Sequence, residues 1–162
     1  MREIALFSDG SVNPQLKVGF GAYLLVDDFS LDLPSYRSKI KLKKFENCSS
    51  TTLEISTLLW ALSDIDLLNQ YLTIYTDCQN LLGLKSRCET FEKNGYLTKS
   101  NRLIGNHELY KAFYRQIKNV NCEWVKVKGH KKSAMKDEID MLFSFVDKAS
   151  RNALRQTLIV KK

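Results

Sequence analysis

Three carboxylates stand at positions where folding of the chain would bring them together. Asp9 and Asp77 each follow a short apolar run, and Glu54 lies in the first turn of a segment with helical spacing. In α/β sheets, functional sites gather at the carboxyl ends of the strands. Each residue alone also fits a structural role, as a turn residue, a helix cap or a partner of the helix dipole. Crowded carboxylates repel one another unless a divalent cation neutralises them, so the trio predicts a metal site.

The apolar pattern around these residues predicts a single domain that spans residues 1–162. Strands are expected over 4–7, 18–26, 36–43, 72–76 and 122–127. Helices are expected from Thr51, after Asp77, over 107–118 and over 140–156. Short connections predict an antiparallel meander for the first three strands, and a helix before each of the last two predicts parallel additions. The expected fold class is α/β, a five-stranded mixed sheet flanked by helices.

The strand expected over 36–43 has an alternating basic face. Its cations, Arg37, Lys39, Lys41 and Lys43, fall on one side of an extended chain. The residues between them include apolar ones, which is typical of a half-buried strand. The basic side equally fits protection of a sheet edge against pairing with other chains.

The composition excludes several classes of protein. The chain has 162 residues, of which 44% are hydrophobic and 27% charged, so it contains enough apolar residues to form a globular core. The sequence has no apolar run of 18 or more uncharged residues, so we expect no membrane association. Four scattered cysteines and two histidines do not form a zinc pattern. We expect a cytoplasmic monomer with reduced thiols.

Positive charge is concentrated in one part of the chain. The formal net charge is +7, and residues 85–132 contain 12 Lys and Arg against 4 Asp and Glu. A basic block of this kind indicates a polyanionic partner, with a lysine-rich solubilising surface as the alternative. Nucleic acid is one such polyanion, and the charge alone does not favour it over the solubilising surface.

Five short motifs, taken in order, resemble the type 1 ribonuclease H family. They are Asp9-Gly10-Ser11, Thr51-Thr52-Leu53-Glu54, Tyr75-Thr76-Asp77-Cys78-Gln79, Val127-Lys128-Gly129-His130 and Val146-Asp147-x-Ala149-x-Arg151. The resemblance covers nearly the whole chain. It implies the ribonuclease H-like fold and an endonuclease that hydrolyses the RNA strand of RNA/DNA hybrids, leaving 5′-phosphate products.

The resemblance also implies a catalytic set. By motif position, the carboxylates of Asp9, Glu54, Asp77 and Asp147 would hold two Mg²⁺ ions, or Mn²⁺, at the scissile phosphate. His130 matches a histidine that assists water activation and product release. An alternative fourth ligand is Asp140, two helical turns before Asp147. We prefer Asp147 because small residues and an arginine surround it, whereas bulky core residues follow Asp140.

Residues expected to contact the hybrid fall into two groups. Near the carboxylates, Ser11, Ser50, Thr51 and Gln79 occupy positions suited to reading RNA 2′-hydroxyl groups, although Ser50 and Thr51 also suit a helix cap. The second group resembles the basic protrusion with which some members grip the DNA strand: Phe91, Lys93, Tyr96, Lys99 and Arg102. For Phe91 and Tyr96 the alternative is a small satellite core beneath a loop.

Two other functions remain open on the sequence. One is a nuclease of the same fold with a different substrate. The other is a non-catalytic nucleic-acid-binding module, which the loss of an acidic position would favour. All four acidic positions are present.

Overall fold

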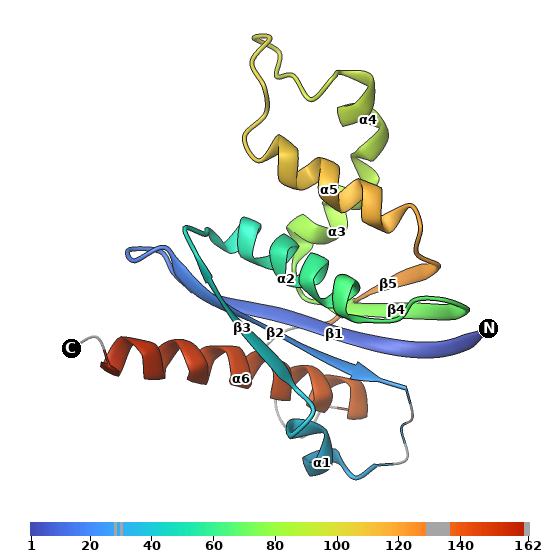
Figure 1. Ribbon diagram of the computed structural model, residues 1–162, viewed down its shortest axis with the longest axis vertical. Helices are drawn as coiled ribbons and strands as arrows, with labels where there is room; N and C mark the ends of the chain where they lie inside the picture. Colours follow the sequence, from blue (N-terminus) through green and yellow to red (C-terminus); the bar gives the residue numbers. More distant parts are fainter. Residues whose placement is uncertain (28, 30, 129–136, 161–162) are drawn as a thin grey trace.

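The computed structural model describes residues 1–27, 29, 31–128 and 137–160 (Figure 1). The strands are β1 (Arg2–Asn13), β2 (Val18–Val26), β3 (Lys41–Glu46), β4 (Gln70–Thr76) and β5 (Cys122–Lys126). The helices are α1 (Leu33–Arg37), α2 (Ser50–Asp64), α3 (Gln79–Ser86), α4 (Cys88–Lys93), α5 (His107–Ile117) and α6 (Glu138–Val160). In these ranges, the structure shows no helix with the length and apolar character needed to cross a membrane.

The strands form one mixed sheet in the order β3-β2-β1-β4-β5. β1 and β3 pair antiparallel with β2, whereas β4 pairs parallel with both β1 and β5. Helices α2, α3 and α5 cover one face, and α6 with α1 covers the other (Figure 1). This arrangement confirms the predicted fold class and the direction of every strand.

The central strand β1 supplies both halves of the core. Ile4 and Leu6 pack in the cluster beneath α2, whereas Ala5 and Phe7 pack in the cluster that contains α6. All four are at most 4% exposed. A strand covered by helices on both faces needs apolar side chains on both sides, so its sequence is a continuous apolar run. Ile4–Phe7 is such a run.

The structure corrects the prediction for residues 36–43. Tyr36 belongs to the short helix α1, where its ring is buried under α6, and β3 begins only at Lys41. Leu42, expected on the buried side, is 45% exposed on this edge strand. Pro34 in the first turn of α1 favours a helix start. The alternating charges that follow it led instead to the prediction of a strand.

A close contact fixes α2 against β2 and so sets the height of α2 above the sheet. A side chain at Gly21 would overlap Thr57, whose hydroxyl donates instead to the Leu53 carbonyl at 2.7 Å. Gly10 of β1 similarly lies against Leu53. Glycine at these two positions lets the N-terminal half of α2 approach the backbone of β1 and β2.

An arm built from α4, the following loop and α5 extends away from the sheet (Figure 1). We call residues 88–106 the protrusion. The protrusion contains the helix α4, which the sequence analysis did not predict. Within the loop, Leu97 and Leu103 form an isolated antiparallel bridge.

Candidate active site

Three carboxylates from three different elements meet at one edge of the sheet. Asp9, Glu54 and Asp77 each offer an oxygen, and these oxygens lie within 4.8 Å of one another. Asp9 is buried, Glu54 is half-buried and Asp77 is exposed. We call these residues the acid cluster. The short distances between these oxygens suit coordination of a cation. The cation would enter from solvent beside Asp77 and be bound by Glu54 and Asp9 on the protein side.

The register of the sheet explains why the two aspartates are neighbours. The parallel pairing of β1 with β4 ends at Phe7 and Tyr75, whose rings stack with centroids 4.8 Å apart. Two residues further along each chain are Asp9 and Asp77. β4 has ended by then, but β1 continues and pairs Asp9 with Ala22 of β2. Asp9 therefore lies inside a strand, contrary to the expected strand end.

The start of α2 positions Glu54. Ser49 caps the helix, since its hydroxyl accepts from the Thr52 N–H at 3.2 Å while Thr52 Oγ1 accepts from the Ser49 N–H at 2.8 Å. Glu54 is thus the fifth residue of the helix, beyond the first turn in which it was expected. A helix dipole acts mainly within its first turn, so it does not account for a glutamate at this position.

Burial and mutual repulsion hold protons on two members of the acid cluster, Asp9 and Glu54. Burial, then the charges of Glu54 and Asp77, raise the pKa of Asp9 to about 10. Burial and the charge of Asp77 raise the pKa of Glu54 to about 8, against hydrogen bonds from the Gly10 N–H and from Asp9. Within the described residues, Glu54 Oε2 is buried without a hydrogen-bond partner. These groups fit a divalent cation, which would satisfy that oxygen and replace the protons.

Asp147 and Asp140, the two candidates for a fourth ligand, have different surroundings. The charge of Asp147 contributes to the raised pKa of both Asp9 and Glu54. Its carboxylate also accepts hydrogen bonds from the guanidinium of Arg151, one from Nε at 3.2 Å. Asp140 lies in the first turn of α6, where its N–H donates to Asp137 Oδ1 at 2.8 Å. The geometry therefore favours Asp147.

The comparisons with known proteins agree with this geometry. The family model described as RNase H matches residues 1–148. The chain belongs to the ribonuclease H family. Its curated relatives include Ribonuclease H of Novosphingobium aromaticivorans, 26% identical over 149 residues that cover 89% of this chain and 96% of that protein. Ribonuclease H of Pseudoalteromonas atlantica is 26% identical over 145 residues, 88% of each chain.

A solved structure supports the fold of this ribonuclease H family member. The crystal structure described as LC9-RNase H1, a type 1 RNase H with the type 2 active-site motif, superposes with a TM-score of 0.69. The alignment covers 94% of this chain and 72% of that chain, at 15% sequence identity. At this identity the likeness concerns the fold.

Of the residues expected to read the RNA strand, Gln79 has the most informative contact. Lys126 Nζ donates to Gln79 Oε1 at 2.9 Å, which leaves the amide NH₂ of Gln79 available as a donor. Lys126 is a residue that the sequence interpretation missed. Lys126 pairs with Thr76 in the parallel β4–β5 register, and Gln79 follows Thr76 by three residues. An alignment of the two strands would therefore have placed Lys126 near Gln79.

Ser11, Ser50 and Thr51 lie around the same edge of the sheet. Ser11 Oγ is 3.1 Å from Ser150 Oγ of α6, and Ser50 and Thr51 are the first two residues of α2. The capping hydroxyl belongs to Ser49 instead. A cavity of about 180 Å³ adjoins the acid cluster, lined by residues that include Thr51, Glu54, Asn80 and Arg87.

The protrusion residues separate into buried aromatics and exposed cations. Tyr96 is 7% exposed, and Phe91 stacks on Tyr110 of α5 with ring centroids 5.7 Å apart. These two rings form the satellite core and do not present a free aromatic face. Lys93, Lys99 and Arg102 are exposed. Only the cations of this group are placed to meet a polyanion.

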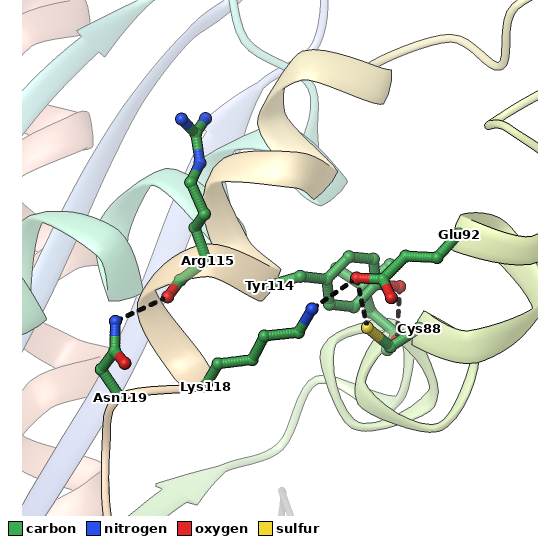
Figure 2. A network of polar contacts seen from close by, with 7 residues as sticks. Cys88, Glu92, Tyr114, Arg115, Lys118 and Asn119 are labelled. Carbon is green, nitrogen blue, oxygen red and sulfur yellow. Dashed lines mark hydrogen bonds and ion pairs between the residues drawn. The ribbon is translucent and has the colours of Figure 1, made fainter.

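A polar network ties the protrusion to α5 (Figure 2). Glu92 of α4 accepts from Lys118 Nζ at 2.7 Å and from Cys88 Sγ at 3.4 Å. The hydrogen bond from Lys118 is the main cause of the lowered pKa of Glu92. Tyr114 of α5 donates to the Leu84 carbonyl at 2.7 Å, which adds a buried link to α3. His130, the remaining predicted catalytic residue, lies outside the described residues.

Proposed function

We propose that this ribonuclease H family member is an endonuclease that hydrolyses the RNA strand of RNA/DNA hybrids and leaves 5′-phosphate ends. The observation that carries the proposal is the convergence of Asp9, Glu54 and Asp77, with burial that disfavours the charged forms of Asp9 and Glu54. A buried group of carboxylates costs folding free energy unless a bound cation offsets the repulsion. A site that binds metal and phosphate retains such a cost because its function requires carboxylates in close contact.

The candidate metal ligands are Asp9, Glu54, Asp77 and Asp147, which would hold two Mg²⁺ or Mn²⁺ ions. Bound divalent ions of this kind activate a water molecule and stabilise negative charge on the leaving 3′ oxygen. Asp9 must release its proton when a cation binds, because its pKa of about 10 keeps it protonated at neutral pH. Arg151 holds the carboxylate of Asp147 through Nε and Nη2, so this ligand is oriented before metal binds.

Discrimination between RNA and DNA would depend on hydrogen bonds to the 2′-hydroxyl groups. Gln79, with its carbonyl held by Lys126, presents an NH₂ donor next to Asp77. Ser11, Ser50 and Thr51 add hydroxyl groups at the same edge of the sheet. His130 would accept or deliver a proton during turnover, a role that an imidazole side chain can perform.

Binding of the DNA strand would use the exposed cations of the protrusion. Lys93, Lys99 and Arg102 would contact phosphates, which positions the duplex without reading its sequence. Phe91 and Tyr96 contribute indirectly, because their packing on α5 holds the arm in place.

The test is a cleavage assay with four substrates of one sequence: an end-blocked RNA/DNA hybrid, double-stranded RNA, double-stranded DNA and single-stranded RNA. With Mg²⁺ we expect internal cuts in the RNA of the hybrid alone, phosphatase-sensitive 5′ ends, and no cleavage in excess chelator. Cleavage of another substrate would indicate a nuclease of different specificity. Tight hybrid binding without cleavage at any metal concentration would indicate a binding module.

A further inference from the structure

A groove lies between α1 and α6, on the face of the sheet that α2 does not cover. Its volume is about 410 Å³, within the range of sites for small ligands. It is lined by Arg37, Ile40, Phe145, Lys148, Ala149 and Asn152. We call it the α1–α6 groove. Its lining combines two cations and an amide with apolar side chains.

Arg37 is held in place at the edge of this groove. Its guanidinium carbon lies 4.3 Å from the centroid of the Phe145 ring, and that ring is only 6% exposed. Stacking of this kind occupies one face of the guanidinium and leaves its N–H edge free for hydrogen bonds. A guanidinium oriented in this way binds phosphate or carboxylate oxygens through two parallel hydrogen bonds.

The charges of the α1–α6 groove are not compensated by neighbours. The groove lining contains no Asp or Glu, and within the described residues no ion pair involves Arg37 or Lys148. Two cations that share one concave site repel each other and raise the local concentration of anions. Asn152 lies one helical turn beyond Lys148 and can donate or accept.

The α1–α6 groove is separate from the acid cluster. Phe145, Lys148, Ala149 and Asn152 share one flank of α6, and at 3.6 residues per turn these residues lie roughly 100° to 160° around the helix from Asp147. The two sites are therefore on different sides of one helix, which measures roughly 10 Å across with its side chains. A ligand in the groove would not contact Asp147.

We propose that the α1–α6 groove binds a nucleotide, with its phosphate on Arg37 and Lys148. Asn152 would contact the polar edge of the sugar or base, and Ile40 and Ala149 would pack against the apolar surface of the ring, beside the buried Phe145 that orients Arg37. A bare anion would leave this apolar floor unused, which is why the lining favours a nucleotide over inorganic phosphate. The nucleotide comes either as a free mononucleotide or as one unit of a longer strand.

The binding experiment uses the full chain in EDTA, where the acid cluster carries no metal and repels phosphate. The probes are AMP, a single-stranded oligonucleotide of eight adenylates, inorganic phosphate and an octamer of glutamate, each titrated by calorimetry and by NMR chemical-shift mapping. The test variant is Arg37→Gln with Lys148→Gln. The control variant, Lys39→Gln with Lys41→Gln, removes the same charge from neighbouring exposed residues outside the groove.

We expect AMP to shift resonances of Arg37, Lys148 and Asn152, and the test variant to bind AMP at least tenfold more weakly than the control variant. Lys148→Gln alone, at an exposed position, should give part of this loss without any effect on packing. Tighter binding of the oligonucleotide than of AMP, with the same shifts, would identify a strand as the source. Equal affinity for the two would identify the mononucleotide.

Three results would overturn the proposal. Equal losses in the test and control variants would show that only overall charge matters. Inorganic phosphate that binds as tightly as AMP would show that the apolar floor takes no part. Saturable binding of the glutamate octamer at this groove, without binding of AMP, would make it a peptide site. None of these results depends on hybrid cleavage, so the proposed nuclease activity is tested separately.

Discussion

The acid cluster and the protrusion place their charges in opposite surroundings. In the acid cluster, Asp9 is 4% exposed and the pKa values of Asp9 and Glu54 are strongly raised, because burial and like charges act together. At the protrusion, the side chain of Glu92 is 42% exposed and forms an ordinary ion pair with Lys118, which follows α5 and is 60% exposed. Single charges should therefore matter far more in the acid cluster than in the protrusion.

The difference also separates chemistry from binding. Three carboxylates, on β1, on α2 and directly after β4, are held by the parallel register and by the close packing of α2, so a cation would meet a site that is already formed. The exposed cations of the protrusion are carried by a short helix and a loop. Rigid elements suit precise coordination, and solvated cations suit the sequence-independent binding of a phosphate backbone.

The largest expected effect is that of Asp9→Asn on cleavage. Loss of a buried metal ligand should lower the rate of hybrid cleavage by at least about a thousandfold, since transition-state charge is no longer neutralised. The measurement is single-turnover cleavage of labelled hybrid in Mg²⁺. The control Asp27→Asn, which removes an exposed carboxylate paired with Arg2, should cleave normally. Unchanged turnover by Asp9→Asn would contradict the metal assignment.

The same substitution should stabilise the metal-free protein at neutral and higher pH. A carboxyl whose folded-state pKa lies above its unfolded value favours folding at low pH, and this contribution falls progressively as pH rises from the unfolded value, 3.8 for Asp9 and 4.5 for Glu54, to the folded-state pKa, about 10 for Asp9 and about 8 for Glu54. In EDTA, we expect Asp9→Asn to exceed the wild type by about 2 kcal/mol at pH 8 and by little at pH 4.

Urea unfolding at pH 4, 6 and 8 measures this difference, with and without Mg²⁺. Added Mg²⁺ should stabilise the wild type and leave Asp9→Asn nearly unaffected, because a ligand that binds only the folded state raises its stability. A stability difference that is the same at every pH would show that repulsion within the acid cluster is not its cause.

A smaller effect is expected when the cations of the protrusion are removed. Changing Lys93, Lys99 and Arg102 together to alanine should raise KM about tenfold and leave the rate at saturating hybrid nearly intact. Each lost phosphate contact should reduce the slope of log K against log salt by about 0.9, with B-DNA as the reference duplex. Wild-type affinity and salt slope in the triple variant would show that these residues are solvated and do not grip the hybrid.

The smallest effect is expected from the ion pair beside them. Glu92→Gln should lower Tm by no more than about 2 °C, because an exposed pair gains little in water and is screened by salt. Thermal unfolding at low and high salt, with Lys118→Gln and the double variant, measures the coupling. A much larger Tm shift that persists in high salt would show that single charges matter as much in this network as in the acid cluster.

The order of the five strands and of the helices α2, α3, α5 and α6 was predictable because each depends on local periodicity, whereas the short helices α1 and α4 were not predicted. The buried run Ile4–Phe7 and the helical spacing after Thr51 were interpreted correctly, whereas the cap is formed by Ser49 with Thr52 and not by Ser50 or Thr51. The third strand was placed wrongly. Its charges alternate through residues that the structure divides between α1 and β3, and Tyr36 is buried only because α6 returns across it.

For the candidate site, the sequence by itself determined which side chains were available: carboxylates on neighbouring elements, a hydroxyl-rich helix start and a basic block. Only the tertiary structure decided that Asp9 lies inside β1, that Lys126 holds Gln79, and that Tyr96 is buried while Lys99 is exposed. It also decided that Arg37 stacks on Phe145, more than a hundred positions away. Periodicity is a property of neighbours along the chain, whereas burial, register and charge compensation depend on contacts between segments far apart in the sequence.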